Sequence, residues 1–246
     1  MVLNIGHRGF GVHSLENTLM SFKRAIDTGL DMVELDVRLT RDREVVVFHD
    51  KGLKRLASIN AKINDLDYDI VKELRISLKK NKLLDIWGSI PTLDEVLSLS
   101  KNKIGLNIEI KADGKHSDFL INQVIERVNH HNMKDEVVIS SFSKKILEIG
   151  ASIDEGFRYG LVFHKRVNSK QFTLNDRPLY SIHPYKFLVN KKLVQTAKEQ
   201  GLKIYPWTAN SEKLMRKLIS LGVDGIITNY PIKLANLKLI LRDKSE

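Results

Sequence analysis

Two pairs of charged residues, each with one position between its members, are the first sign of chemistry in this sequence. Glu34 and Asp36 lie within one apolar run, and Glu109 and Lys111 repeat the spacing in another. Because side chains at i and i+2 of a strand leave the same face, each pair is expected to project together. Charges buried without partners are costly, so the three acids need either a cation or a network of ion pairs.

A divalent metal ion satisfies that requirement. Three carboxylates with water form an oxygen site suited to Mg²⁺ or Ca²⁺, and the lack of cysteine argues against zinc. We therefore expect Glu34, Asp36 and Glu109 to be metal ligands. The alternative is a network of ion pairs in which Arg8 and Lys111 neutralise the same acids.

Two histidines complete this set of residues. His7 ends the first apolar run, and His49 ends a run that follows the Glu34 segment. Cleavage of a phosphodiester needs a base for a hydroxyl proton and an acid for the leaving alkoxide, and two histidines can supply both. Arg8 and Lys111 would contribute positive charge for the phosphate oxygens.

The bulk composition indicates one soluble domain. The chain has 246 residues, 42% of them hydrophobic, and no cysteine, so we expect a single domain over 1–246 and a cytoplasmic location. The start of the chain does not resemble a secretory signal, and no run is apolar enough for a membrane span. The formal net charge of +10 is spread over short lysine and arginine groups, as on a solvated surface.

Eight short β-branched runs alternate with segments of helical periodicity, which predicts an α/β protein with a (β/α)8 TIM barrel. An open doubly wound sheet is the competing fold, but its glycine-rich nucleotide signature is missing. The expected helices cover residues 17–28, 118–131 and 193–200, and Thr92 with Glu95 predicts a capping box. The expected strands lie near residues 2–7, 32–37, 104–111, 136–140, 158–162, 179–183, 203–207 and 225–228.

The segment "ELDVRLTRDREVVVFHD" departs from that alternation. Its two strand-like runs are too close for a parallel crossover, so we expect an antiparallel hairpin. A turn centred on Asp42 and Arg43 would place His49 opposite Asp36. Residues 51–90 carry no barrel strand and are expected to form a small, partly helical cap inserted after this hairpin.

The sequence resembles the glycerophosphodiester phosphodiesterase family. The resemblance rests on blocks in family order between residues 6 and 231: "GHRG", "ENT", "ELDVRLTRD", "VVVFHD", "IPTLDEVL", "NIEIK", "SSF", "YPWTAN" and "GVDGIITNYP". It implies a TIM-barrel hydrolase that converts glycerophosphodiesters, such as glycerophosphocholine or glycerophosphoethanolamine, to sn-glycerol 3-phosphate and an alcohol. Attack by the glycerol 2-hydroxyl through a cyclic phosphate is the implied mechanism.

The same resemblance implies roles for individual residues. His7 and His49 correspond to the acid/base pair, Glu34, Asp36 and Glu109 to the ligands of one Mg²⁺ or Ca²⁺ ion, and Arg8 and Lys111 to the phosphate contacts. Trp207 is similar to a tryptophan beside the glycerol, although a packed aromatic at a strand end would look the same.

The family pattern has proline in place of Leu15 and aspartate in place of Asn229. The first departure is expected to alter only the loop before the first helix, and the second to alter the hydrogen bonding at the end of the eighth strand. His183 is expected either to face the substrate or to be structural.

Two other functions remain open at this point. A phospholipase acting on intact lipids would share the barrel and the two histidines, and would need apolar residues at the mouth; Phe10, Phe163 and Phe187 are the candidates. A non-enzymatic protein that binds phosphate-rich partners, including nucleic acid, would use the basic surface, but aromatic residues do not alternate with the basic groups. We therefore expect a small-molecule substrate, no nucleic acid and no integral membrane segment.

Overall fold

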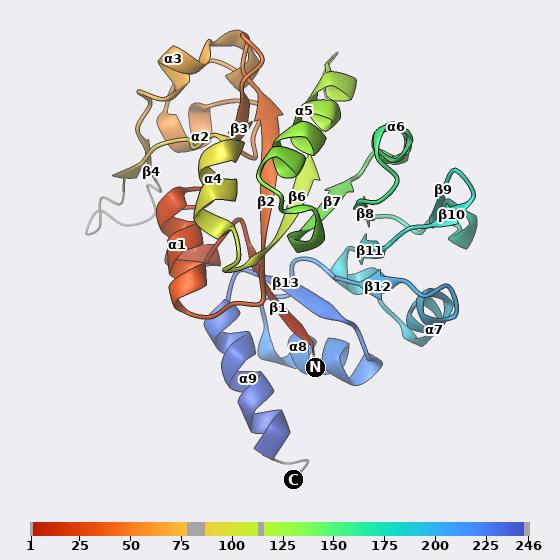
Figure 1. Ribbon diagram of the computed structural model, residues 1–246. Coiled ribbons are helices and arrows are strands. Elements are labelled where there is room, and N and C mark those ends of the chain that lie inside the picture. Colours follow the sequence, from red (N-terminus) through yellow and green to blue (C-terminus); the bar gives the residue numbers. More distant parts are fainter. Residues whose placement is uncertain (1, 78–86, 113–115, 244–246) are drawn as a thin grey trace.

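Parallel strands close into a barrel in the computed structural model, which describes residues 2–77, 87–112 and 116–243 (Figure 1). The strand order around the barrel is β1, β2, β6, β7, β8, β11, β12, β13, and backbone hydrogen bonds from Asp224 to Ile204 (3.1 Å) and from Ile227 to Pro206 (3.0 Å) join its two ends. The predicted (β/α)8 barrel is confirmed. The strands span Leu3–His7, Met32–Leu39, Gly105–Ile110, Val137–Ser141, Arg158–Phe163, Ser181–Pro184, Lys203–Ile204 and Gly225–Thr228.

Helices surround the barrel, and several begin at a side-chain cap. The hydroxyl of Thr18 accepts the backbone N–H of Ser21 at the start of α1, and the predicted capping box between Thr92 and Glu95 is present at α4. Within the described residues, none of the helices is long and apolar enough to cross a membrane. The helices of the barrel are α1 (Leu19–Asp27), α4 (Leu93–Ser100), α5 (Ser117–His130), α6 (Lys144–Ile153), α7 (Lys191–Glu199), α8 (Glu212–Leu221) and α9 (Pro231–Asp243).

Strand β2 shows how the barrel separates its core from its site. Val33, Leu35 and Val37 are fully buried and belong to the main apolar core with residues of the surrounding helices. The alternate positions Glu34 and Asp36 are also buried, but on the other face of the strand. The barrel interior therefore receives carboxylates from the same strand that supplies apolar residues to the core.

The expected hairpin is present, but its predicted register was wrong by one residue. Strand β3 (Val45–Val47) pairs antiparallel with β2, and Val37 lies opposite Val47. The backbone N–H of Phe48, not of His49, therefore meets the carbonyl of Asp36, at 2.9 Å. The physical reason is the connection from Thr40 to Glu44, which has an odd number of residues and contains Arg43 in the left-handed conformation (φ 70°).

The segment after the hairpin forms short elements around a second apolar cluster. These are α2 (Lys54–Ala57), a 3-10 turn (Ile63–Asp65), α3 (Tyr68–Val71), β4 (Ile76–Ser77) and β5 (Trp87–Gly88); residues 78–86 of the expected cap lie outside the described residues. The cluster includes Phe48, Leu53 and Leu56. Leu15 is fully buried in it, so this residue does more than shape a loop, contrary to the sequence-based expectation. That these elements form a cap on a single domain stays a prediction.

Candidate active site

Three carboxylates converge inside the barrel at the carboxyl ends of β2 and β6. Glu34, Asp36 and Glu109 each offer an oxygen atom within 4.8 Å of the oxygens of the others, and all three side chains are buried. Asp36 and Glu109 are direct neighbours in the β2–β6 ladder, which explains the convergence of two segments far apart in sequence. A donor set of three carboxylate oxygens fits a hard divalent cation.

The electrostatics of this cluster favour a bound cation as well. Burial, followed by the Asp36 and Glu109 charges, raises the pKa of Glu34 well above its usual range. Burial also raises the pKa of Glu109, although Lys111 opposes the effect. Burial alone would raise the pKa of Asp36 too, but Lys111 and Arg8 hold it far below its usual value. Two of the three carboxylates thus lack enough positive charge from the protein, and a metal ion would supply it.

The turn after β1 explains the sequence His7-Arg8-Gly9. Arg8 adopts a left-handed backbone (φ 55°), and its N–H donates to a Glu34 carboxylate oxygen at 3.0 Å. Gly9 follows with φ 98°, and a β-carbon there would lie 2.4 Å from the hydroxyl of Ser21. Only glycine fits against helix α1 at this point, so the turn carries His7 and Arg8 to the carboxylates in a defined orientation.

His7 is held by an amide. Its Nδ1–H donates to the Asn229 side-chain oxygen at 2.6 Å, and its Nε2 lies 3.9 Å from Glu34. Burial and the nearby Arg8 lower the pKa of His7 to about 4. Asn229 is itself fixed, because its N–H donates to Asn210 and its carbonyl accepts from Val12. A neutral His7 with a free Nε2 is the resulting state.

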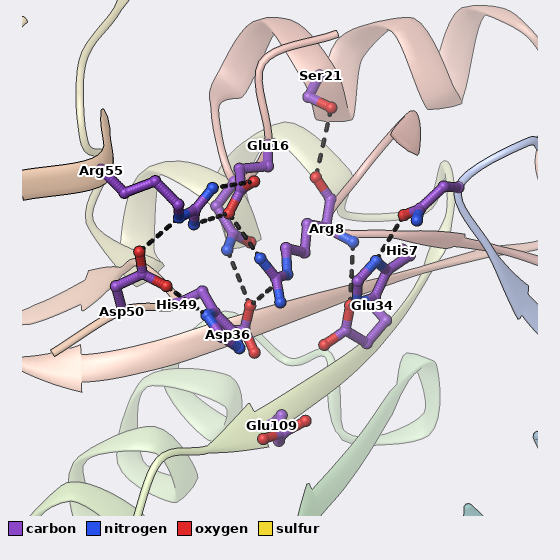
Figure 2. Close-up of polar contacts among 12 residues, drawn as sticks. His7, Arg8, Glu16, Ser21, Glu34, Asp36, His49, Asp50, Arg55 and Glu109 are labelled. Atoms are coloured by element: carbon purple, nitrogen blue, oxygen red, sulfur yellow. Dashed lines mark hydrogen bonds and ion pairs between the residues drawn. The ribbon is translucent and has the colours of Figure 1, made fainter. Parts of the chain in front are cut away.

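His49 is held by a carboxylate instead. Its Nδ1–H donates to Asp50 at 2.7 Å, and the other oxygen of Asp50 accepts from Nε of Arg55 at 2.6 Å. Burial lowers the pKa of His49, while the Asp36 charge opposes that effect. The Asp36 charge acts on the His49 ring, and Figure 2 draws the two side chains together, so the expected return of this histidine to the carboxylates is confirmed although the register was wrong.

A chain of charged groups links the two sides of the site. The Glu16 carboxylate accepts hydrogen bonds from the guanidinium of Arg55 at 2.6 and 2.8 Å and from that of Arg8 at 2.7 Å; Figure 2 draws these contacts. The Arg8 guanidinium also lies 3.4 Å from Asp36. Arg55 belongs to α2 in the segment after the hairpin. That segment therefore contributes directly to the positions of both Arg8 and His49.

The two expected phosphate contacts are both close to the carboxylates. Lys111 lies 2.7 Å from Asp36 and also contacts Glu109. Burial would lower the pKa of Lys111, but Asp36 and Glu109 raise it, so the ammonium stays charged. With Arg8 at Asp36, two cations border the triad, as a phosphate site requires. The same contacts also satisfy part of the ion-pair alternative, in which these cations only neutralise the acids.

Trp207 lies on the opposite side of the barrel mouth among other aromatic residues. Its ring centroid is 5.5 Å from those of Phe142 and Tyr185, and Tyr185 lies at the same distance from Phe187. Phe142 and Phe187 have exposed fractions of 44% and 71%. We call Phe142, Tyr185, Phe187 and Trp207 the aromatic rim.

The aromatic rim corrects the sequence-based expectation about apolar residues at the mouth. Of the three candidates Phe10, Phe163 and Phe187, the first two are buried in the core, and Phe187 alone is exposed. The residues of the rim follow β7, β11 and β12, so no local spacing in the sequence could group them. His183 is buried and bonded to Ser181 at 2.8 Å, which supports its structural role.

Several residues of the site had no role assigned from the sequence. Two side chains of the "ENT" block belong to the site. Glu16 accepts hydrogen bonds from two arginines, and Asn17 donates to Asp36 at 2.9 Å. Asp50 and Arg55 also carry no motif spacing of their own. Asp50 could have been found from its position next to His49, since a carboxylate that orients a catalytic histidine is common.

The barrel gathers carboxylates, two histidines and two cations at the carboxyl ends of its strands, where the active sites of α/β barrel enzymes lie. Comparisons with known proteins agree. The model of the glycerophosphoryl diester phosphodiesterase family matches residues 7–233, so the chain belongs to this family of enzymes. No helix that could cross a membrane is found in the described residues, and the expected cytoplasmic location stays a prediction.

Relatives and solved structures point the same way. A glycerophosphodiester phosphodiesterase of Caldanaerobacter subterraneus subsp. tengcongensis is 34% identical over 96% of this chain and 97% of its own. A human lysophospholipase D is 28% identical over 94% of this chain and 84% of its own. An Oleispira antarctica phosphodiesterase, solved with the product sn-glycerol-3-phosphate, has a TM-score of 0.84 and 26% identity, with 95% of each chain covered.

Proposed function

We propose that this enzyme hydrolyses glycerophosphodiesters, such as glycerophosphocholine and glycerophosphoethanolamine, to sn-glycerol 3-phosphate and an alcohol. The observation that carries the proposal is the convergence of two differently held histidines, two cations and three buried carboxylates at one end of the barrel. The product complex of the Oleispira antarctica relative supports the choice of product.

Glu34, Asp36 and Glu109 would hold one Mg²⁺ or Ca²⁺ ion. When bound, such an ion stabilises the negative charge that develops on the phosphate oxygens. The raised pKa values of Glu34 and Glu109 support this role, because buried acids of this kind need more positive charge than Arg8 and Lys111 provide. The proposed ligand set is thus matched to a cation by both geometry and charge.

We assign the base to His7 and the acid to His49. Asn229 accepts the Nδ1 proton of His7, which leaves Nε2 ready to take the proton of the glycerol 2-hydroxyl. Asp50 accepts from Nδ1 of His49, and its negative charge favours a protonated ring that can donate Nε2–H to the leaving alkoxide. The attacking hydroxyl belongs to the substrate, so proximity contributes much of the acceleration, and a cyclic phosphate results.

Arg8 and Lys111 would bind the phosphate oxygens. Both are already oriented by carboxylates, Arg8 by Glu16 and Lys111 by Asp36, so little side-chain entropy remains to be lost when the substrate binds. Trp207 would contact the glycerol at the opposite side. In the second half of the reaction, water opens the cyclic phosphate with the roles of the two histidines reversed.

Release of sn-glycerol 3-phosphate from glycerophosphocholine tests the proposal. The measurement uses the wild type with a chelator, with Mg²⁺ or Ca²⁺ restored, and the variant His49→Ala. We expect the chelator to abolish release, one of the ions to restore it, and His49→Ala to lower kcat by at least about a hundredfold. The matched control is His130→Ala, an exposed histidine at the end of α5, which should behave as the wild type.

Each result has a definite reading. Full activity in the chelator would remove the metal ion from the proposal, and full activity of His49→Ala would remove the two-histidine mechanism. A folded, metal-loaded enzyme that releases no sn-glycerol 3-phosphate from any glycerophosphodiester would overturn the substrate class.

A lysophospholipid is the second candidate substrate. The aromatic rim favours it, because Phe142 and Phe187 expose apolar surface at the mouth that a water-soluble glycerophosphodiester does not need. The human lysophospholipase D among the relatives gives further support. Phe187→Ala should raise KM for lysophosphatidylcholine and leave glycerophosphocholine unchanged, with Leu239→Ala on the remote helix α9 as the control. If Phe187→Ala and Leu239→Ala change KM for lysophosphatidylcholine equally, the aromatic rim does not bind the lysophospholipid.

A further inference from the structure

A basic groove leads away from Lys111 on the side of the mouth opposite Trp207. It is a cavity of about 910 Å³ between the end of β2, the segment after the hairpin and the start of α5. None of the described residues that line it is acidic. Its basic and titratable lining residues are Arg38, Arg41, Lys51, Lys62, Lys111 and His116.

The groove is continuous with the active site through two residues. Lys111 lines it and contacts the carboxylates Asp36 and Glu109. Arg38 also lines it, and its Nε donates to the backbone carbonyl of His49 at 2.8 Å. A substrate whose phosphate meets Lys111 next to His49 would therefore have one substituent at the entrance of this groove.

The geometry of the barrel indicates which substituent of the phosphodiester lies at the entrance of the groove. Around the eight strands, β6 and β12 are separated by four positions in either direction, so Lys111 after β6 and Trp207 after β12 face each other. With the glycerol at Trp207, the other substituent of the phosphodiester extends toward the groove. This substituent is the leaving alcohol.

The charges of the groove indicate what kind of alcohol it takes. Lys111 already forms ion pairs with carboxylates of the site. Arg41 donates from Nε to Asp67 at 2.8 Å. Lys62 is exposed, and no ion pair of its ammonium occurs within the described part of the chain. A cation on the wall of a cavity whose described lining holds no acid attracts an anion, and a phosphate offers several acceptor oxygens to such a group.

We propose that this basic groove binds an anionic group on the leaving alcohol, above all a phosphate, so that the preferred substrates are glycerophosphodiesters with a second phosphate. The inference rests on the proposed function and names its substrate class. The volume is in the range of small-molecule sites, which fits a phosphorylated polyol.

A pair of substrates that differ only in the second phosphate tests the inference. Release of sn-glycerol 3-phosphate is measured from glycerophosphoinositol and from glycerophosphoinositol 4-phosphate, at constant ionic strength and constant free metal ion. We expect KM to be about tenfold lower for the phosphorylated substrate, with a similar kcat, because the extra group adds a charge-assisted contact in binding.

Charge variants locate the effect. Lys62→Glu should raise KM for glycerophosphoinositol 4-phosphate and leave glycerophosphoinositol unchanged, and added salt should weaken the preference of the wild type. Lys213→Glu, an exposed position on α8, is the control and should retain the preference. Equal KM values for the two substrates would overturn the inference, as would a preference that survives in the double variant Lys51→Glu, Lys62→Glu. If neither substrate nor glycerophosphocholine is cleaved, the proposed function itself fails.

Discussion

The two sides of the barrel mouth handle charge in opposite ways. On the side of β1, β2 and β6, which we call the charged side, buried Glu34, Asp36 and Glu109 are surrounded by Arg8 and Lys111. On the side of β7 to β12, the aromatic rim is exposed, the ammonium of Lys186 lies over its Tyr185 and Phe187 rings, and the buried His183 beneath it is neutral because burial lowers its pKa to about 3.

Under the proposed function, this difference assigns catalysis to the charged side and recognition to the aromatic side. Buried charges are tolerated where opposite charges and hydrogen bonds are provided in the same structure, and such groups keep fixed positions. Exposed aromatic rings gain by covering apolar substrate, and they tolerate substrates of different shape. We therefore expect substitutions on the charged side to act mainly on kcat and substitutions on the aromatic side to act mainly on KM.

The largest expected effect comes from Glu34→Gln on the charged side. Loss of a proposed ligand should lower kcat/KM by about a thousandfold or more. Because burial and its neighbours already disfavour the charged form of Glu34, the melting temperature of the metal-free protein should stay equal or rise. Kinetics and thermal unfolding check the two parts, with Glu126→Gln on the surface of α5 as the control. An active variant would contradict the metal site.

Arg55→Met on the charged side should have the next largest effect. It removes the cation that joins Glu16 to Asp50, so both Arg8 and His49 lose an orienting contact. We expect kcat to fall by about 10- to 100-fold with a smaller change in KM. Steady-state kinetics would measure this, and Arg216→Met, which breaks a surface ion pair on α8, is the matched control. A change in KM alone would place Arg55 among binding residues instead.

Trp207→Ala tests the aromatic side and should have a smaller effect. The indole N–H donates to the carbonyl of His183 at 2.9 Å, which fixes the ring at the mouth. We expect KM for glycerophosphocholine to rise by about 5- to 20-fold, with kcat nearly unchanged, if the ring covers the glycerol. Trp207→Phe should recover most of the loss. A fall in kcat equal to that of Arg55→Met would erase the proposed distinction between the two sides.

His183→Gln should have the smallest effect on activity, and its effect is on stability. The pKa of His183 is lower in the folded state than the ordinary value of 6.5, so below pH 6.5 the unfolded state binds a proton that the folded state does not. The free energy of unfolding should therefore decrease as the pH falls from 6.5 toward 3, by about 1.4 kcal/mol per pH unit. Because the lowered pKa of His7 adds a slope of the same sign, urea unfolding at several pH values should show a pH slope that is smaller in the variant than in the wild type by about 1.4 kcal/mol per pH unit.

Much of the fold could be predicted from the sequence, because it depends on local patterns. Eight β-branched runs, the helical spacing between them and the capping box at Thr92 are local features, and all are present. The pairing of Glu34 with Asp36 on one face follows from strand geometry alone. These features determined the barrel class and gathered the acids at the carboxyl ends of the strands.

Only the tertiary structure decided the rest. The register of the β2–β3 hairpin depended on a single left-handed residue, Arg43, and no turn motif in the sequence predicts that conformation. The contacts of Arg55 with Glu16 join residues that are 39 positions apart, and the aromatic rim and the basic groove each combine side chains from several strands or loops. The physical reason is that spacing reports on neighbours within one element, whereas contacts between elements exist only after the barrel has closed.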